Sequence, residues 1–342
     1  MVGALVSSGF RAASGKHLPN WKALQLPLSI ESERLKSLPA GQSADAYYSY
    51  LKASGKALKS ALPKLGLLIV DQKLQPEIEE ALPILWTDFP DAAMDFILQK
   101  SYPASYSGET RLVPPGVIAE KPYFIGPDTL IGEGTIIESN VRIGARVKIG
   151  TGCRIGAGSR INDDTIIGND CVLLGMDAIG GPGFGTIRYP GSEVQRMRAH
   201  VGRVVIGDRV RLGSHVSIDR GVFDDTQIGD DCLFDNHVQV GHNCIIGKNS
   251  IFCSFVGLSG STIVGDQTVF AGMVGTAGHV KIGSRVVVAA QSGISKDIED
   301  GAQVKGYPPK PIAEALKIQT LVGKLPELFE RIKKIEKSKE SK

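Results

Sequence analysis

The sequence predicts a mainly β protein built as a left-handed parallel β-helix, and three observations carry this prediction. An aliphatic or aromatic residue returns at every sixth position in successive runs between Ile125 and Ile294, and most of these residues are followed by Gly. An α-helix repeats near 3.6 residues and a strand near 2, so a sustained period of six matches the hexapeptide repeat of a parallel β-helix. The composition agrees, because 41 glycines and only 6% aromatic residues suit narrow, repeated turns.

The repeated residues, called anchors below, predict which residues lie above one another. Three hexapeptides close one triangular coil, so residues eighteen apart should stack in adjacent coils at the strand spacing of about 4.8 Å. The phase of the repeat breaks after Ile179 and slips again after Ile218. The anchors are Ile125, Ile131, Ile137, Ile143, Ile149, Ile155, Ile161, Ile167, Leu173, Ile179, Ile206, Leu212, Ile218, Ile228, Phe234, Val240, Ile246, Phe252, Leu258, Val264, Phe270, Thr276, Ile282, Val288 and Ile294.

Residues 1–105 lack the six-residue period and are predicted to form a small α/β domain of the nucleotide-binding type. Residues 65–71 (LGLLIVD) and 83–87 (PILWT) read as strands. Residues 90–100 are predicted to form a helix that Pro90 opens, and residues 43–61 have helical composition. Tyrosines in the latter segment either pack against neighbouring elements or offer a stacking surface for a base.

The second predicted domain is the β-helix itself, residues 117–305. Residues 181–203 interrupt it as an excursion with several arginines and a single acidic residue, Glu193. A loop extruded from a solenoid builds a binding wall or is decoration, and the charge together with Phe184 and Tyr189 favours the wall.

Residues 309–342 are predicted to form a C-terminal helical extension. Apolar residues recur there at spacings of three and four, which is a helical seam that needs a partner. Gly323 and Pro326 interrupt the seam, so two short helices are expected. The opposite face carries an excess of lysines, which is either a solvated face or a basic patch for an acidic partner.

Bulk properties exclude several classes. A formal charge of +3 over 342 residues does not argue for nucleic acid binding. The five cysteines show no CxxC spacing and are predicted to be reduced core or wall residues in a cytoplasmic protein. No apolar run reaches the length of about 18 residues that spans a bilayer, so any membrane contact should be peripheral. The apolar run near the start is too short for a signal peptide.

One column of the predicted solenoid carries candidate catalytic residues. His242 lies two positions after its anchor, and Gly260 and Gly278 occupy the same place in the next two coils. A histidine base and a main-chain N–H that faces a developing oxyanion are the two parts that acyl transfer from a thioester requires. Asp235 is predicted to orient the His242 ring, and His279 is a second candidate histidine.

Two other classes of function remain open from the residues alone. A zinc site of the trimeric γ-carbonic anhydrase kind would gather His237, His242 and His279 between subunits. A non-enzymatic solenoid scaffold is the other alternative. Zinc analysis separates the first from acyl transfer, and the column of histidine and glycine argues against the second.

Several segments resemble the bacterial UDP-3-O-(3-hydroxyacyl)glucosamine N-acyltransferases of lipid A biosynthesis. They are GPGFG after Ile179, GRVVIGDRVRLGSHVSIDRG, DDTQIGDDCLFDNHVQVGHN, the GLSGS and TAGH segments and GYPPKP, and together they span about residues 180–311. ILWTDFPDAAMDFILQKSYP extends the similarity into the first domain. The O-acylating relatives have no comparable first domain.

The resemblance implies a homotrimer with sites between subunits and no metal. A 3-hydroxyacyl group would pass from acyl carrier protein, on its phosphopantetheine, to the 2-amine of a UDP-3-acylated glucosamine. The catalytic residues implied are His242, Asp235, Gly260 and His279, and the substrate-binding residues predicted are Tyr47, Tyr48, Asn236 and Gln239. The family's Asn-Pro-Lys-aromatic segment is absent, and AYYSYLKASG stands in its place.

Overall fold

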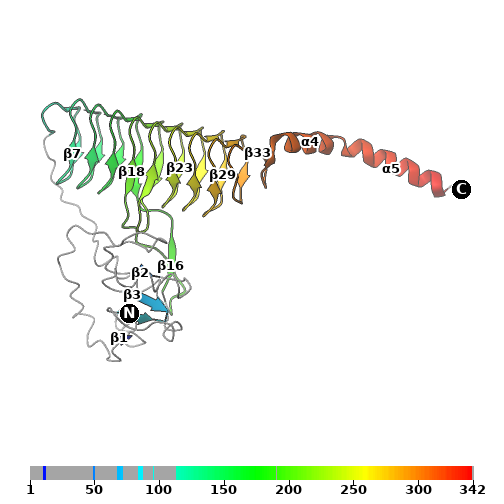
Figure 1. Cartoon of the computed structure of the whole chain (residues 1–342), viewed down its shortest axis with the longest axis horizontal. Helices are drawn as coiled ribbons and strands as arrows, with labels where there is room; N and C mark the ends of the chain where they lie inside the picture. The colour runs from blue at the N-terminus through cyan, green and yellow to red at the C-terminus, as the bar shows by residue number, and fades with distance from the viewer. Residues whose placement is uncertain are drawn as a thin grey trace.

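The structure is a computed structural model that describes residues 113–189 and 191–336, the backbone of residues 337–340 and, nearer the N-terminus, residues 11–12, 49–50, 68–71, 84–87 and 95. Three sheets form the walls of a β-helix from β5 (Ile118–Ala119) to β33 (Gln303–Lys305), and two helices follow it (Figure 1). The predicted fold class is confirmed.

Each wall is named after its first strand. The β5 wall comprises β5, β8 (Ile136–Ile137), β11 (Arg154–Ile155), β14 (Val172–Leu173), β19 (Arg211–Leu212), β22 (Leu233–Phe234), β25 (Ile251–Phe252), β28 (Val269–Phe270), β31 (Val287–Val288), β33 and the antiparallel β34 (Lys310–Pro311). The β6 wall comprises β6 (Phe124–Ile125), β9 (Arg142–Ile143), β12 (Arg160–Ile161), β15 (Ala178–Gly181), β20 (Ser217–Asp219), β23 (Gln239–Val240), β26 (Gly257–Leu258), β29 (Gly275–Thr276) and β32 (Gly293–Ile294). The β7 wall comprises β7 (Leu130–Ile131), β10 (Lys148–Ile149), β13 (Ile166–Ile167), β18 (Val204–Ile206), β21 (Thr226–Ile228), β24 (Ile245–Ile246), β27 (Ile263–Val264) and β30 (Lys281–Ile282).

The register between strands follows the predicted count. Ile131, Ile149 and Ile167 pair in succession, so partners in adjacent coils are eighteen residues apart. Ile167 then pairs with Ile206, and Ile206 with Ile228. The extra residues in these two coils are the excursion and the shorter slip, both at the places where the phase of the sequence breaks.

The core is a column of anchors inside the prism. In most strands the first residue points outward and the anchor inward, because successive side chains of a strand alternate between its faces. The rings of Phe234, Phe252 and Phe270 stack with centroids 4.7 Å and 5.0 Å apart. All five cysteines are free, and four of them are buried, as predicted.

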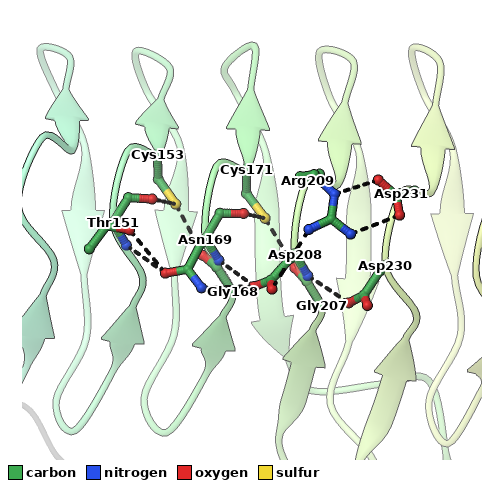
Figure 2. A network of polar contacts seen from close by, with 10 residues as sticks. All are labelled: Thr151, Cys153, Gly168, Asn169, Cys171, Gly207, Asp208, Arg209, Asp230 and Asp231. Atoms are coloured by element: carbon green, nitrogen blue, oxygen red, sulfur yellow. Dashed lines mark hydrogen bonds and ion pairs between the residues drawn. The ribbon is translucent and has the colours of Figure 1, made fainter.

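Polar side chains tie one coil to the next at the corners (Figure 2). Oδ1 of Asn169 accepts a hydrogen bond from the main-chain N–H of Thr151 (3.0 Å), and Oδ1 of Asp208 accepts one from N–H of Asn169 (2.7 Å). Arg209 donates two hydrogen bonds to Asp231, at 2.7 Å and 2.9 Å. The corners therefore satisfy main-chain donors that the short strands leave unpaired.

The excursion of residues 181–203 contains an antiparallel hairpin of β16 (Thr186–Arg188) and β17 (Gln195–Met197). Figure 1 shows this hairpin reaching away from the solenoid, towards the side where the N-terminal strands lie. The fully buried carboxylate of Asp95 accepts hydrogen bonds from the hydroxyl of Tyr189 and from the main-chain N–H of Ala199 (2.7 Å). Asp95 and the excursion are thus in direct contact.

The N-terminal strands are β1 (Arg11–Ala12), β2 (Ser49–Tyr50), β3 (Leu68–Asp71) and β4 (Ile84–Thr87), in the sheet order β1-β4-β3-β2. The strands predicted in residues 65–71 and 83–87 are confirmed. The helix expected over residues 43–61 is wrong at β2, which pairs in parallel with β3, because a sheet edge overrides local propensity. Asp95 is helical, and the rest of the helix predicted over 90–100 lies outside the described residues.

Two helices end the chain, α4 (Ile312–Gly323) and α5 (Leu325–Glu340), as the interrupted seam predicts. Figure 1 shows them extending beyond the last coil. No residue of α4 is buried, and Leu328, Phe329 and Ile332 of α5 are exposed, so the seam is uncovered in the single chain. In the part of the chain that is described, no helix has the length and apolar character needed to cross a bilayer.

Candidate active site

An open cavity of about 720 Å³ lies against the β6 wall where the excursion leaves the solenoid. Strands β20, β23, β26 and β29 contribute its floor, and the first residues of the excursion contribute its rim. The lining residues are Pro182, Gly183, Phe184, Met197, Asp219, Gln239, Gly241, His242, Gly257, Leu258, Ser259, Gly260, Gly275 and Thr276. The excursion is therefore a wall of this cavity, as its composition predicts.

His242 lies at the corner that follows β23, and its ring is held by the next residue. Its Nδ1 lies 3.1 Å from Oδ1 of Asn243. The Asn243 amide is fixed in turn, since its Oδ1 accepts from N–H of Val222 (3.0 Å) and its Nδ2 donates to O of Asp224 (3.4 Å). An amide oxygen only accepts, so this network assigns the hydrogen to Nδ1 and leaves Nε2 of the neutral ring with a free lone pair.

Gly260 lies directly above this nitrogen. A Cβ at Gly260 would lie 2.6 Å from both Nε2 and Cε1 of His242, and a Cβ at Gly241 would lie 2.7 Å from N of Gly260. No hydrogen bond between described residues uses the N–H of Gly260. The predicted stacking of Gly260 over His242 is confirmed, and it leaves a main-chain donor beside the lone pair of the imidazole.

Asp235 does not orient His242 in this chain. It follows β22 at the preceding corner of the prism, and its carboxylate accepts hydrogen bonds from N–H of Asn236 (2.8 Å) and from N–H of Ser254 (3.2 Å) and its hydroxyl. Within one chain, one hexapeptide plus one residue carries the backbone round to the next corner, which separates Asp235 from His242. Asn243, which sequence reasoning missed, takes the place of Asp235 within the chain.

Other predicted site residues are placed differently. Oδ1 of Asn236 accepts from N–H of Ser214 (2.9 Å) at the same corner as Asp235, away from the cavity. His279 lies two coils above His242 with its ring exposed, and it does not line the cavity. Tyr47 and Tyr48 lie outside the described residues.

Gln239 does line the cavity, and it holds a carboxylate that the sequence analysis overlooked. Its Nε2 donates to Oδ2 of Asp219 (3.0 Å) and to O of Val240 (3.3 Å). Burial raises the pKa of the Asp219 carboxyl, against the opposing effects of this hydrogen bond and of the nearby His242. The sequence does not place Asp219 near His242, because the slip after Ile218 interrupts the eighteen-residue spacing that identifies stacked residues.

A second imidazole packs against His242 from the excursion. The rings of His200 and His242 meet edge to face, with centroids 5.2 Å apart. Nδ1 of His200 lies 2.9 Å from O of Arg198, so that nitrogen carries the hydrogen, and Nε2 has no hydrogen-bond partner among the described residues. Burial lowers the pKa of His200 to about 4, which keeps the ring neutral near pH 7.

Above Gln239 the outward positions of the β6 wall are glycines. Gly257, Gly275 and Gly293 are in register in successive coils. A Cβ at Gly257 or Gly275 would meet nothing within 4 Å, whereas one at Gly293 would lie 2.2 Å from the ring of Tyr307. These positions form a strip without side chains that begins in the cavity and ends at the Tyr307 ring.

The zinc alternative finds no ligand set within one chain. His237 stacks on His215 at a different corner from His242, with ring centroids 4.9 Å apart. Across the described ranges, no three His, Cys, Asp or Glu side chains are grouped as metal ligands. The described part of the chain therefore brings together a base and a main-chain donor, and its histidines do not gather in threes.

Comparison with known proteins agrees with this architecture. The family described as bacterial transferase hexapeptide (six repeats) matches residues 128–163 and 225–260, so the chain carries hexapeptide repeats of the bacterial transferase type. Among solved structures, a UDP-N-acetylglucosamine acyltransferase from Francisella novicida is similar with a TM-score of 0.51 and 22% identity, over 59% of this chain and 73% of that one. At that identity the likeness concerns the fold.

Matches to curated proteins have higher identity but cover shorter segments. A UDP-3-O-acylglucosamine N-acyltransferase from Leptospira biflexa serovar Patoc is 46% identical over 78 residues, 23% of this chain and 22% of that protein. The same enzyme from Dechloromonas aromatica is 48% identical over 71 residues, 21% of this chain and 20% of that one. The matched segments thus span about a fifth of the relatives.

Proposed function

We propose that this protein is an N-acyltransferase that moves a 3-hydroxyacyl group from acyl carrier protein to the 2-amine of a UDP-3-acylated glucosamine in lipid A biosynthesis. One observation carries the proposal. The free lone pair of His242 Nε2 and the unused N–H of Gly260 lie beside each other in one cavity. The names of the partial relatives support the choice of substrate.

The geometry suits direct attack on a thioester. Nε2 of His242 takes a proton from the acceptor amine while the C–N bond forms, and N–H of Gly260 donates to the developing oxyanion. The tetrahedral intermediate then collapses, the C–S bond breaks, and the imidazolium returns the proton to the leaving thiolate. Asn243 Oδ1 holds Nδ1–H throughout, which stabilises the imidazolium.

The strip over Gly257 and Gly275 is the proposed path of the acyl chain. It starts beside the reacting centre and has no side chains to obstruct a hydrocarbon, while the exposed ring of Phe184 adds apolar surface at its start. The ring of Tyr307 over Gly293 closes the far end. The acyl chain length is therefore set by the number of coils between the base and this ring.

Other parts of the proposed homotrimer bind the rest of the two substrates. The protein acts in the cytoplasm as a homotrimer, and Asp235 and Asn236, which lie at another corner, reach a His242 site across a subunit boundary. The first domain, with Tyr47 and Tyr48, binds the uridine. The C-terminal helices dock the acidic carrier protein with its phosphopantetheine, chiefly through the lysines of α5.

Thiol release tests the proposal. The full-length protein is incubated with 3-hydroxyacyl carrier proteins of graded chain length and a UDP-3-acylated glucosamine. Wild type should release thiol only with both substrates, and His242→Ala should lose a factor of about 10² to 10⁴ in kcat. Lys281→Ala, which removes an exposed side chain from the β7 wall, is the control. Turnover that survives in His242→Ala, or stoichiometric zinc in active protein, would refute the proposal.

A further inference from the structure

Three side chains that line the cavity have acceptor atoms that no described residue uses. Oδ2 of Asp219 accepts from Gln239, and its Oδ1 accepts no hydrogen bond from the described residues. Gln239 uses its Nε2 on Asp219 and on O of Val240, so its Oε1 is left as an acceptor. With Nε2 of His242, three acceptors line the cavity, and the main-chain N–H of Gly260 is a donor.

The carboxylate of Asp219 and the ring of His242 interact electrostatically. The charge of His242 lowers the pKa of Asp219, against the larger effect of burial, which raises it. Both residues line the same cavity, one at the end of β20 and the other just after β23 in the adjacent coil. Nε2 of His242 and a carboxylate oxygen with a free lone pair therefore belong to the same cavity, on adjacent coils.

We infer that Asp219 selects an amine over a hydroxyl as the nucleophile of the proposed acyl transfer, on which this inference rests. An amine has two N–H groups, so one can donate to Asp219 while the other donates to Nε2 of His242. A hydroxyl has a single hydrogen and can satisfy only one of the two acceptors. The other would be left desolvated without a donor, which is the arrangement that gives strong discrimination in buried polar sites.

The step balances with the groups on hand. The neutral amine gives the N–H that faces His242 to Nε2 as its nitrogen bonds to the thioester carbon, and keeps the N–H that faces Asp219 in the product amide. The thiolate leaves with the electrons of the C–S bond and receives the proton from His242. Asp219 remains a carboxylate, and its negative charge stabilises the imidazolium that forms between these two events.

Paired acceptors test this role. Wild type and variants receive the same acyl carrier protein thioester with either UDP-3-O-acylglucosamine or its counterpart with a hydroxyl at C2, and mass spectrometry distinguishes the amide from the ester product. In Asp219→Asn, kcat/KM for the amine should fall on the order of 100-fold, the value of a charge-assisted hydrogen bond. The inhibition constant of the hydroxyl analogue should fall, because the variant no longer leaves a desolvated carboxylate without a donor when that ligand binds.

Two further variants separate selection from structure. Asp219→Glu keeps the carboxylate and should restore most of the preference for the amine. Glu193→Gln removes one exposed negative charge from the excursion and should behave as wild type. An active wild type whose Asp219→Asn variant keeps its amine turnover would overturn the role of Asp219 alone. A wild type inactive towards both acceptors would overturn the proposed function, and this role with it.

Discussion

Replacing Asn243 by glycine removes the group that fixes the tautomer of His242. Asn243 has a φ of 59°, in the left-handed region, where glycine is unstrained, so this substitution deletes the side chain without forcing the backbone. It deletes the hydrogen bond from Nδ1 of His242 and those with Val222 and Asp224. The imidazole is then free to place its proton on Nε2, where it cannot accept one from a nucleophile.

The magnitude follows from the bond that is lost. With a neutral imidazole a hydrogen bond contributes about 1 kcal/mol, and with the imidazolium of the transition state about 1.5–3 kcal/mol. The difference, about 0.5–2 kcal/mol, is added to the barrier from the bound complex. Since about 1.36 kcal/mol corresponds to tenfold in rate, kcat should fall about 2- to 30-fold, with a smaller change in KM. Single-turnover thiol release measures this without interference from product release.

Two variants control the experiment. Asn243→Asp keeps an acceptor for Nδ1–H and should retain most of the activity. Ser261→Gly makes the same backbone change one coil above, at a φ of 61°, and should leave kcat unchanged. If Asn243→Gly turns over as fast as wild type, or if Asn243→Asp is equally slow, the tautomer argument is refuted.

Three other perturbations have definite expected outcomes. Burial lowers the pKa of His200 to about 4, so between pH 6.5 and 4 the folded state binds fewer protons than the unfolded state. The free energy of unfolding should therefore fall by on the order of 3 kcal/mol as pH drops through this range. Urea unfolding of His200→Gln should show a flatter dependence on pH. Tyr307→Ala should shift the preferred acyl donor to longer chains by opening one more coil of about 4.8 Å, and unchanged selectivity would exclude that path. Phe252→Ala should destabilise the protein by about 3–5 kcal/mol, seen as a lower Tm, because its ring is fully buried between two others.

Much of the fold could be predicted because each wall of each coil buries a single anchor. The period of six then fixes the strands, and the count of eighteen places Gly260 over His242 without coordinates. The same count does not identify the residue that contacts the His242 ring. It shows which residues stack in one column, but not at which corner of the coil a neighbouring residue lies. Asp235 is predicted because it precedes His242 by one hexapeptide and one residue, whereas Asn243 reaches the ring from the next position, in a left-handed corner.

Other parts of the site depend on departures from the repeat. Asp219 sits beside the slip in the register, so no column count connects it to His242. His200 reaches the ring of His242 through an excursion whose hairpin pairing and contact with Asp95 are tertiary events. The sequence indicated that the excursion binds something, through its arginines, Phe184 and Tyr189, but offered no spacing that would bring His200 onto His242.

The position of the cavity along the solenoid determines how partial unfolding affects activity. Each coil is bonded only to its immediate neighbours, so a solenoid loses structure first at its exposed ends. The cavity takes its residues from β20 to β29, with several coils below them and at least one above. Local unfolding that starts at the N-terminal coils therefore leaves the cavity intact until several coils are lost. Unfolding that starts at the C-terminal coils should reach the cavity sooner and reduce turnover first.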